Sequence, residues 1–313
     1  MRVVALAGGV GGAKLAAGLA KVLPPGALSV VVNTADDFDL WGLRICPDLD
    51  TVMYTLAGIS NPETGWGMVD ESFNALNMIS LYGEDTWFKL GDRDLATHIL
   101  RTRRLREGSR LTKITAEFTT ALGVRCNILP MCDEPVSTVL KTSEGCLDFQ
   151  EYFVRRAQRD EVSGVELRGI ENACVPTEIQ KVVVHADVVI LCPSNPLVSI
   201  GPILAVPGMR ELLARSLVPK VAVSPIIGGR ALKGPADKML YSLGHEVSAA
   251  GVARMYEGIV DGMVIDRIDE GEEARLSTSG LRALVTDTIM RDETDRERLA
   301  QEILRFCSET VTR

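Results

Sequence analysis

The fold is decided by residues 2–33, RVVALAGGVGGAKLAAGLAKVLPPGALSVVVN. They open with a short apolar run rich in valine, which is typical of a fully buried strand. A glycine-rich turn follows, and the apolar residues from Leu15 to Val22 recur at helical spacing. Two prolines and a glycine end that helix, and the run LSVVVN is a second buried strand. This order predicts an α/β fold, Rossmann-like and doubly wound, with a mostly parallel sheet.

A second pattern, made of helices only, interrupts this alternation. We find no convincing strand between residues 47 and 123, and strands resume at residue 124. We therefore expect a Rossmann-like nucleotide-binding core of residues 1–46 and 124–313, with residues 47–123 inserted as a helical subdomain that acts as a lid. The apolar spacing predicts helices over about 49–58, 68–82, 92–106 and 109–122, and a terminal amphipathic helix over 293–307.

The composition is that of a globular protein. Of 313 residues, 46% are hydrophobic and 24% are charged, which excludes a disordered or collagen-like chain. The 42 acidic residues outnumber the 34 basic ones, and the formal net charge is −8. A chain of this charge is a poor partner for nucleic acid, although a local basic patch can still bind a phosphate. Three histidines are too few for a metal site built from several of them.

The cysteines and one uncharged stretch bear on the compartment. The seven cysteines are odd in number and scattered, and none forms a C-x-x-C pair, so we interpret them as reduced thiols of a cytoplasmic protein. Residues 188–209 carry no charge over 22 positions, which is long enough for a membrane span. Four prolines interrupt them, which is typical of a strand, a loop and a helix start. We expect no membrane-spanning segment.

The loop Gly8-Gly9-Val10-Gly11-Gly12 stands between the first strand and its helix. Glycines allow a tight turn and the close approach of a ligand, and the N–H groups at a helix N-terminus favour an anion. Two common templates fail here. The dinucleotide fingerprint needs glycine at the position of Lys14, and the Walker pattern needs Gly-Lys-Ser/Thr where Ala-Lys-Leu stands. We predict a phosphate or nucleotide site of neither type; the alternative is a tight turn that binds nothing.

Carboxylates gather where the second strand ends. Asn33, Asp36 and Asp37 lie at the carboxyl edge of the predicted sheet, where ligands bind in such folds. One carboxylate there could bind a ribose, whereas two adjacent ones suit Mg²⁺; a turn without function is the alternative. Further along, Asp48 is a natural helix N-cap. From spacing alone, Asp50 could either stabilise the helix dipole from the first turn or belong to a ligand site.

A basic segment follows within the predicted insertion. Residues 89–113 hold eight basic and three acidic side chains, a net charge of +5 (8 − 3), and we expect this segment to close over an anionic ligand. Lys89 stands beside a glycine at a helix N-terminus and is a candidate phosphate ligand. In the helix itself, Asp94, His98 and Arg101 belong to a polar stripe. We interpret this stripe as a solvent-exposed face and His98 as a surface histidine.

Two later loops leave buried strands, one around Ser194-Asn195 and one over residues 224–229. If the sheet is parallel, both loops reach the same edge as the glycine loop. The amide of Asn195 suits a base edge or a ribose. Each loop by itself could be an ordinary connection, but three loops at one edge predict a nucleotide site.

Seven stretches of the chain together resemble the 2-phospho-L-lactate transferases of coenzyme F420 biosynthesis. They occur in the order typical of that family and span most of the chain to about Met255. One departure is VGGA (10–13), where a Thr-Gly-Thr-Pro-like segment is expected, so backbone N–H groups would have to hold the phosphates. The stretches are GGVGGAKLAAGL (8–19), VVNTADDF (31–38), PDLDTVMYTLAG (47–58), KLGDRDLATHILR (89–101), NILPMCDEPVSTVLKT (127–142), PSNPLVSIGPILAVPGMREL (193–212) and SPIIGGRALKGPADKM (224–239).

The resemblance implies a Mg²⁺-dependent transfer of a phosphoryl group. In the family, the terminal ribityl hydroxyl of the deazaflavin Fo attacks the phosphorus of a GDP-activated phospholactate, or of its enolpyruvyl counterpart, and GMP leaves to give a phosphodiester. By motif, the Fo-contacting residues are Asp50 and Lys89, which we also expect to act in catalysis. Mg²⁺ would bind Asp36 or Asp37. The residues expected to bind the nucleotide are Gly8, Gly9, Gly11, Gly12, Ser194 and Asn195.

Two other classes of protein share part of this pattern. A nucleotide-sugar-binding regulatory protein of the gluconeogenesis-factor type would share the glycine loop but would not need Asp50 or the KLGDRD segment. An NAD(P)-dependent oxidoreductase is opposed by the failed fingerprint at Lys14. The pattern leaves the three-carbon acid open among phospholactate, phosphoenolpyruvate and phosphoglycerate. A homodimer is the default expectation for the oligomer.

Overall fold

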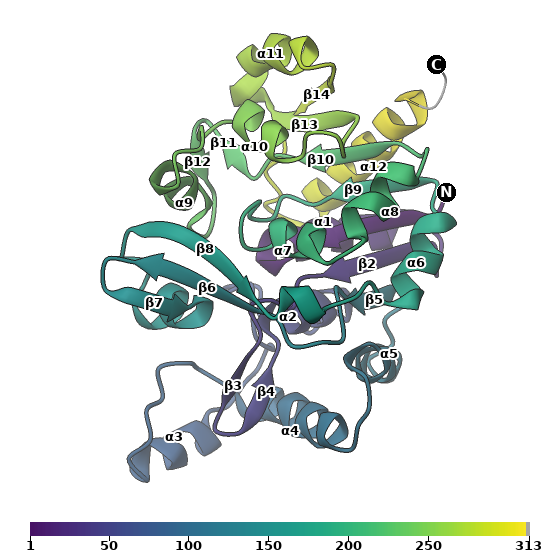
Figure 1. The fold of residues 1–313 in the computed structure, drawn as a ribbon. Helices are drawn as coiled ribbons and strands as arrows, with labels where there is room; N and C mark the ends of the chain where they lie inside the picture. The colour runs from purple at the N-terminus through teal and green to yellow at the C-terminus, as the bar shows by residue number, and fades with distance from the viewer. Residues whose placement is uncertain (311–313) are drawn as a thin grey trace.

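The computed structural model describes residues 1–310, and its centre is a seven-stranded sheet (Figure 1). Its strands lie in the order β14-β13-β10-β9-β1-β2-β5, and each neighbouring pair is parallel. This confirms the predicted Rossmann-like α/β fold. The strands are β1 (Val3–Ala7), β2 (Leu28–Val32), β5 (Asn127–Pro130), β9 (Val188–Leu191), β10 (Lys220–Val223), β13 (Gly262–Asp266) and β14 (Arg282–Thr286).

The order of the strands reverses between β1 and β9, which are neighbours in the sheet. From β1 the chain adds β2 and then β5 on one side, and from β9 it adds β10, β13 and β14 on the other. Val3 to Leu6 of β1 pair in register with Val188 to Leu191 of β9. In doubly wound folds the loops that follow two such strands border the ligand site.

Helices cover both faces of the sheet, and each face buries an apolar layer (Figure 1). One face packs against α1 (Gly9–Val22), α2 (Pro47–Leu56), α5 (Leu111–Ala121) and α12 (Glu293–Thr310). Because α1 packs against both α2 and α12, the C-terminal helix belongs to the core. The other face packs against α6 (Thr177–Val184), α7 (Ile200–Ala205), α8 (Met209–Arg215), α9 (Ala236–Ser242), α10 (Ala249–Met255) and α11 (Glu273–Thr278).

A smaller body projects from the sheet at the bottom of Figure 1. It consists of the hairpin β3 (Phe38–Leu40) and β4 (Leu43–Ile45) together with α3 (Asn74–Leu81) and α4 (Asp92–Arg106). Its apolar cluster is centred on Ile45, Leu90 and Leu95. Because α2 and α5 pack on the central sheet, the projecting body is smaller than residues 47–123.

The predicted helices of this segment are found with shifted ends. α4 spans the predicted residues 92–106, and α2 and α5 lie within about two residues of their predictions. The predicted helix over 68–82 begins only at Asn74, because Met68 instead forms a bridge with Ser60 in the preceding loop.

A separate antiparallel sheet, in the order β7-β6-β8, flanks the edge of the central sheet. Phe149 and Tyr152, which follow the hairpin of β6 and β7, pack with Val198 and Met239. This cluster ties the small sheet to the loop after β9 and to α9. The remaining elements are β6 (Ser137–Thr142), β7 (Gly145–Asp148), β8 (Val162–Arg168), the short pair β11 (Ile226–Ile227) and β12 (Arg230–Ala231), and the turns η1 (Glu151–Arg155), η2 (Ile170–Asn172) and η3 (Arg267–Glu272).

The uncharged stretch folds as predicted, and the cysteines differ in burial. All seven cysteines are free, and four of them, Cys46, Cys132, Cys192 and Cys307, are buried. Residues 188–209 form β9, a loop and α7. Within residues 1–310, every helix is too short or too polar to span a bilayer.

Candidate active site

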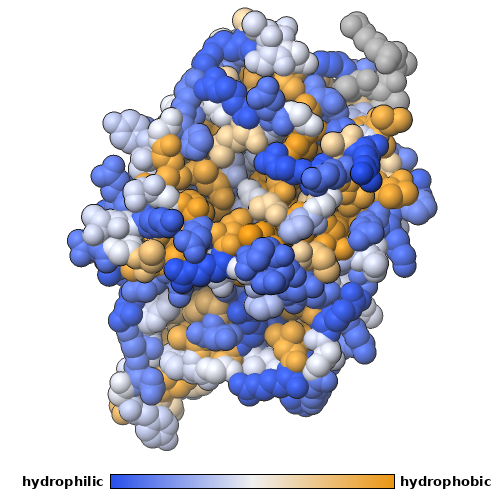
Figure 2. Space-filling view, in the orientation of Figure 1, coloured by the Kyte–Doolittle hydropathy of each residue, from blue (hydrophilic) through white to orange (hydrophobic). Residues whose placement is uncertain are grey.

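A cleft of about 680 Å³ opens between the loops that follow β1 and β9. Its walls come from the glycine loop, the segment from Asp36 to Tyr54, the projecting body, the small sheet and the loops after β9, β10 and β14. The cleft therefore lies where the strand order reverses, as expected for a doubly wound fold. In the view of Figure 2, apolar side chains gather in the middle of the face, above the small sheet of Figure 1.

The glycine loop packs tightly against the loop after β9. The N–H of Gly8 donates to Ser194 Oγ (3.0 Å), and that hydroxyl donates to the carbonyl oxygen of Gly8 (2.7 Å). A Cβ on Gly11 would lie 2.5 Å from the carbonyl oxygen of Pro193, and one on Gly12 would lie 2.6 Å from Ser194 Oγ. Close packing therefore explains part of the glycine content, while the loop still lines the cleft with its backbone.

Ser194 and Asn195 line the cleft, but their side chains already have partners. The Ser194 hydroxyl is used by the glycine loop, as described above, and Asn195 Oδ1 accepts from the backbone N–H of Leu197 (2.9 Å). Both side chains thus shape the loop.

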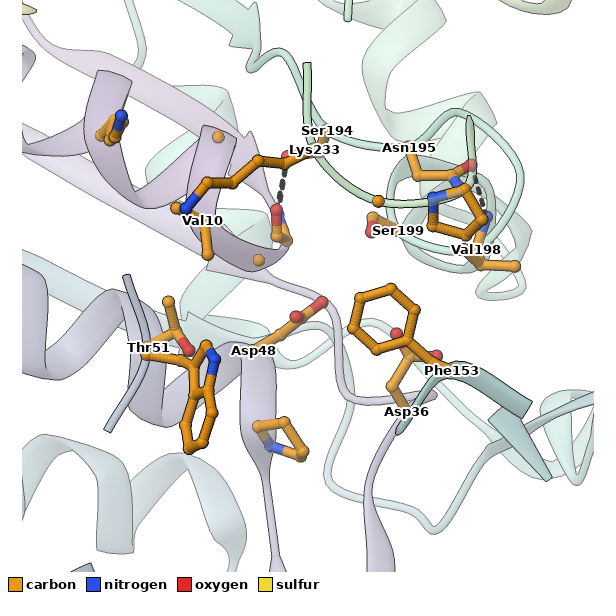
Figure 3. Close-up of a pocket in the computed structure, with 18 of the residues that line it drawn as sticks. Val10, Asp36, Asp48, Thr51, Phe153, Ser194, Asn195, Val198, Ser199 and Lys233 are labelled. Carbon is orange, nitrogen blue, oxygen red and sulfur yellow. Dashed lines mark hydrogen bonds between the residues drawn. The ribbon is translucent and has the colours of Figure 1, made fainter. Parts of the chain in front are cut away.

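The carboxylate of Asp36, which is buried, and that of Asp48, which is half-buried, form a pair in the wall of the cleft (Figure 3). Asn33 Nδ2 donates to Asp48 Oδ2 (3.0 Å), and a Cβ on Gly8 would lie 2.7 Å from that same oxygen. Burial and the neighbouring Asp48 charge raise the pKa of Asp36 well above its ordinary value, and burial raises the pKa of Asp48 to about 6. Among the described residues, Asp36 Oδ1 has no hydrogen-bond partner. Two such carboxylates fit a divalent cation.

The surroundings of this pair differ from the prediction in two ways. Asp37 does not line the cleft; its carboxylate is 1% exposed and lies 3.9 Å from Arg44, and burial raises its pKa to about 7. Asp48 is not a helix N-cap, so that prediction is wrong. α2 begins at Pro47 with Cys46 as its N-cap, because proline suits the first helical position.

A buried network of charged side chains lies between α2 and α4. Arg101 is 1% exposed and hydrogen-bonds both carboxylate oxygens of Asp50. His98 and Asp94 extend the network. The prediction of a solvent-exposed stripe and a surface histidine is therefore wrong, because the polar face of α4 meets partners on α2. Ile99, on the same helix, is 52% exposed.

Asp50, for which the motif implies a contact with Fo, lines the cleft. Burial raises the pKa of Asp50, although the Arg101 guanidinium opposes the rise. Asp50, Asp94 and His98 each offer a ligand atom within 4.8 Å of the others. The guanidinium beside Asp50 makes this trio a poorer cation site than the Asp36–Asp48 pair, which has no basic partner within 4.0 Å among residues 1–310.

Three lysines reach the cleft. Lys89, the candidate phosphate ligand, is exposed on its wall, and Lys14 and Lys233 lie near the glycine loop. Lys14 Nζ donates to the carbonyl oxygen of Met290 (2.9 Å). Burial and the positive charges of Arg296 and Lys233 lower the pKa of Lys14. Because the described residues place no carboxylate within 4.0 Å of these lysines, the arrangement favours an anion.

The basic segment as a whole does not close over the cleft, contrary to expectation. Of the basic residues in 89–113, only Lys89 lines it. Arg101 forms a buried ion pair with Asp50. Arg104 and Arg110 form ion pairs with Glu117 and Glu178 on the surface. The net charge of this segment therefore did not indicate which of its basic side chains reach the cleft.

Aromatic side chains line the part of the cleft formed by the projecting body and the small sheet. Trp87 and Phe88 pack edge to face, with ring centroids 5.5 Å apart, and Phe149 and Phe153 stack at 5.5 Å. Trp66 also lines the cleft, and its neighbour Gly65 lies against Val10 of the glycine loop. Such surfaces suit a planar ring system, whereas the lysines and the glycine loop suit phosphates.

A sequence model of the family 2-phospho-L-lactate transferase CofD matches residues 3–307. The chain belongs to this family. Two CofD-like relatives show the extent of the similarity. The phosphoenolpyruvate transferase of Streptomyces griseus is 41% identical, over 99% of this chain and 99% of its own. The 2-phospho-L-lactate transferase of Methanosarcina mazei is 39% identical, over 96% of this chain and 99% of its own.

Membership of the CofD family confirms the resemblance drawn from the motifs. It supports a transferase with a role in coenzyme F420 biosynthesis and does not favour the regulatory alternative. A solved structure of a UPF0052 family protein from Bacillus halodurans has a TM-score of 0.64 and 17% identity, and covers 97% of this chain and 98% of that one. At that identity the likeness shows a shared fold alone.

Sequence reasoning missed the aromatic residues of the cleft and three of its charged residues, namely Lys14, Asp48 and Lys233. All three stand in the stretches that carry the CofD resemblance, and this was the available signal. Spacing could not reveal them, because Lys233 lies more than 200 residues from the glycine loop that it approaches (Figure 3).

Proposed function

We propose that the chain transfers a phosphorylated three-carbon acid from its GDP-activated form to the ribityl hydroxyl of Fo. An O–P bond forms between that hydroxyl oxygen and the phosphorus bearing the acid, and the bond from this phosphorus to GMP breaks. GMP leaves with the electron pair, and the hydroxyl proton passes to a base. The observation that supports this best is that one cleft of a CofD family member holds the glycine loop, a carboxylate pair, and Asp50 with Lys89.

On the acceptor side, we place Fo against the projecting body. Its planar deazaflavin ring would pack on the aromatic wall around Trp87 and Phe153. Asp50 then accepts the hydrogen of the ribityl hydroxyl, and its raised pKa makes it a better proton acceptor than an ordinary carboxylate. Lys89 stabilises the negative charge that develops on the phosphoryl oxygens.

On the donor side, we place the GDP moiety along the glycine loop and the loop of Ser194. Backbone N–H groups at the start of α1 face an anion there, in line with the missing hydroxyls of VGGA. Lys14 and Lys233 add positive charge on the same wall. Transfer at phosphorus depends mostly on such positioning and charge neutralisation.

Mg²⁺ fits the pair Asp36 and Asp48. Both are carboxylates with raised pKa values, and an oxygen of Asp36 is buried without a partner. A bound Mg²⁺ would neutralise the charge of the diphosphate. Asp36 keeps its predicted role in this proposal, and Asp48 takes the place of Asp37.

The relatives do not single out one acid. Proteins named for phosphoenolpyruvate and for phospholactate are similarly close, at 41% and 39% identity. We propose that the donor carries one of these two acids. Cytoplasmic location and a homodimer stay predictions from the sequence.

The proposal is tested by incubating the protein with Fo, Mg²⁺ and, in separate reactions, each GDP-linked acid, and measuring GMP by chromatography. We expect GMP release that requires both Fo and Mg²⁺. Asp50→Asn and Lys89→Gln should each slow it by at least about tenfold. Lys113→Gln, an exposed lysine outside the cleft, is the matched control and should leave the rate unchanged. No GMP from any donor would contradict the proposal.

A further inference from the structure

The network behind Asp50 is centred on the guanidinium of Arg101, which faces Asp50 on one side and His98 on the other. A guanidinium can only donate, and Arg101 Nη1 lies 3.2 Å from His98 Nδ1, which accepts from it when that nitrogen carries no proton. On the other side of the ring, His98 Nε2 lies 3.2 Å from Asp94 Oδ1. Tyr54 also donates its hydroxyl to Asp94 Oδ1 (2.7 Å). The chain of contacts therefore runs from Asp94, through His98, to Arg101 and Asp50.

The guanidinium of Arg101 hydrogen-bonds both carboxylate oxygens of Asp50. Arg101 Nη1 donates to Asp50 Oδ2 (3.0 Å), and Nη2 donates to Oδ1. Such a two-point contact fixes the plane of the carboxylate, which one hydrogen bond would not do. Each oxygen keeps a second lone pair, and Asp50 is among the residues that line the cleft.

Stability by itself does not account for so large a buried polar cluster. Arg101 and His98 are each 1% exposed, and Asp50 is 5% exposed. Burying ions is costly, and apolar residues of the same size often stabilise a fold as well or better. Asp50, Asp94, His98 and Tyr54 all reach the cleft, so the cluster is placed where it can act on a ligand.

We propose that Arg101 is a positioning residue, whose guanidinium holds the Asp50 carboxylate in the orientation that receives the Fo hydroxyl. His98 and Asp94 hold the guanidinium in turn. This inference rests on the proposed function and adds residues to its acceptor side. Arg101 acts through Asp50 and need not touch either substrate.

The test is steady-state kinetics of Arg101→Lys and Arg101→Met, with Fo and the GDP-linked donor varied in turn. Lysine keeps the charge but cannot make the two-point contact. We expect kcat/KM for Fo to fall roughly 100-fold in both variants, the effect of a misplaced reacting group. The KM for the donor should change by less than about twofold. Arg103→Met, an exposed position on the same helix, is the matched control and should behave as wild type.

A second set of variants covers the case in which Arg101→Met folds poorly. Asp50→Asn combined with Arg101→Met removes both charges and leaves no unpaired buried ion. If Arg101 acts through Asp50, this double variant should turn over Fo no more than about threefold slower than Asp50→Asn alone. If the fold-losses in Fo turnover of the two single variants multiply in the double variant, Arg101 acts independently of Asp50, and the inference would be overturned.

Two further results would also overturn it. A kcat/KM for Fo in Arg101→Lys equal to that of the wild type would contradict a positioning role. So would equal losses of kcat/KM for Fo and for the donor. In both cases the proposed function would stand, as long as the wild-type enzyme turns over. A wild-type protein that releases no GMP with Fo and any of the donors would remove the proposed function and this inference together.

Discussion

At the scale of single residues, Asp48 lies where its surroundings disfavour the ionised form of its carboxylate. Its half-buried carboxylate lies beside Asp36, and its pKa is raised to about 6. Among the described residues, Asn33 Nδ2 and a backbone N–H of the glycine loop donate hydrogen bonds to it. A residue kept in such a position lowers stability, and a bound cation would offset that cost.

We therefore expect Asp48→Asn to stabilise the protein when metal and ligands are absent. The folded protein holds a proton on Asp48 up to about pH 6, whereas an unfolded chain releases it near pH 3.9. Stability thus falls as the pH rises through this window, and the full penalty is present above it. The substitution should raise the free energy of unfolding by roughly 1–3 kcal/mol at pH 8 and change it little at pH 4. Urea unfolding with EDTA at both pH values measures this.

Asp148→Asn, at an exposed carboxylate on β7, is the control and should have no such pH-dependent effect. Destabilisation by Asp48→Asn at pH 8 would show instead that the ionised carboxylate is well accommodated. In either case the same variant should release GMP more slowly, because the Mg²⁺ pair is broken.

At the scale of elements, the contact between the glycine loop and the loop after β9 brings the two halves of the sheet together. A helix interior normally gains stability when alanine replaces glycine. Gly11 is an exception, because its Cβ would lie 2.5 Å from a backbone oxygen of Pro193. Gly11→Ala should lower the free energy of unfolding by roughly 1–3 kcal/mol and weaken GDP binding, as measured by urea unfolding and calorimetric titration.

Gly271→Ala is the matched control, since a Cβ there meets nothing within 4 Å. It should change neither stability nor GDP binding. If Gly11→Ala were as stable as the wild type and bound GDP equally well, the close packing of the two loops would not be needed for the site.

The helix α4 shows what sequence patterns can and cannot give at this scale. Its bounds, residues 92–106, follow from periodicity and are found as predicted. Its orientation does not follow, because a polar stripe reads the same whether water or a buried partner faces it. The partner of Arg101 is Asp50, some fifty residues earlier, and only the packing of α2 against α4 reveals the pair.

At the scale of the whole molecule, the sequence sufficed for the sheet and for the edge that binds ligands. Buried strands with connecting helices determine a parallel sheet, and its carboxyl edge collects the glycine loop, Asp36 and the loop of Ser194. The motifs added Asp50 and Lys89. The hairpin β3–β4 was missed, because three-residue strands are too short to show a period.

The acidic C-terminal region also has a clearer role than its sequence indicated. Residues 261–313 hold thirteen acidic and eight basic side chains, a net charge of −5 (8 − 13), and little family signal. Yet β13 and β14 complete the sheet, α12 packs on α1, and Met290 lines the cleft and accepts from Lys14. Net charge argued against nucleic acid but gave no information about a nucleotide site.

The central claim is that Fo attacks the phosphorus that bears the three-carbon acid. It is tested most directly with a GDP-linked donor carrying ³²P only at that phosphorus, mixed with enzyme, Fo and Mg²⁺ and separated by chromatography. The account predicts that all of the label appears in a product containing both Fo and the acid, with unlabelled GMP. Label recovered in GDP, or in the free phosphorylated acid without an Fo product, would contradict it.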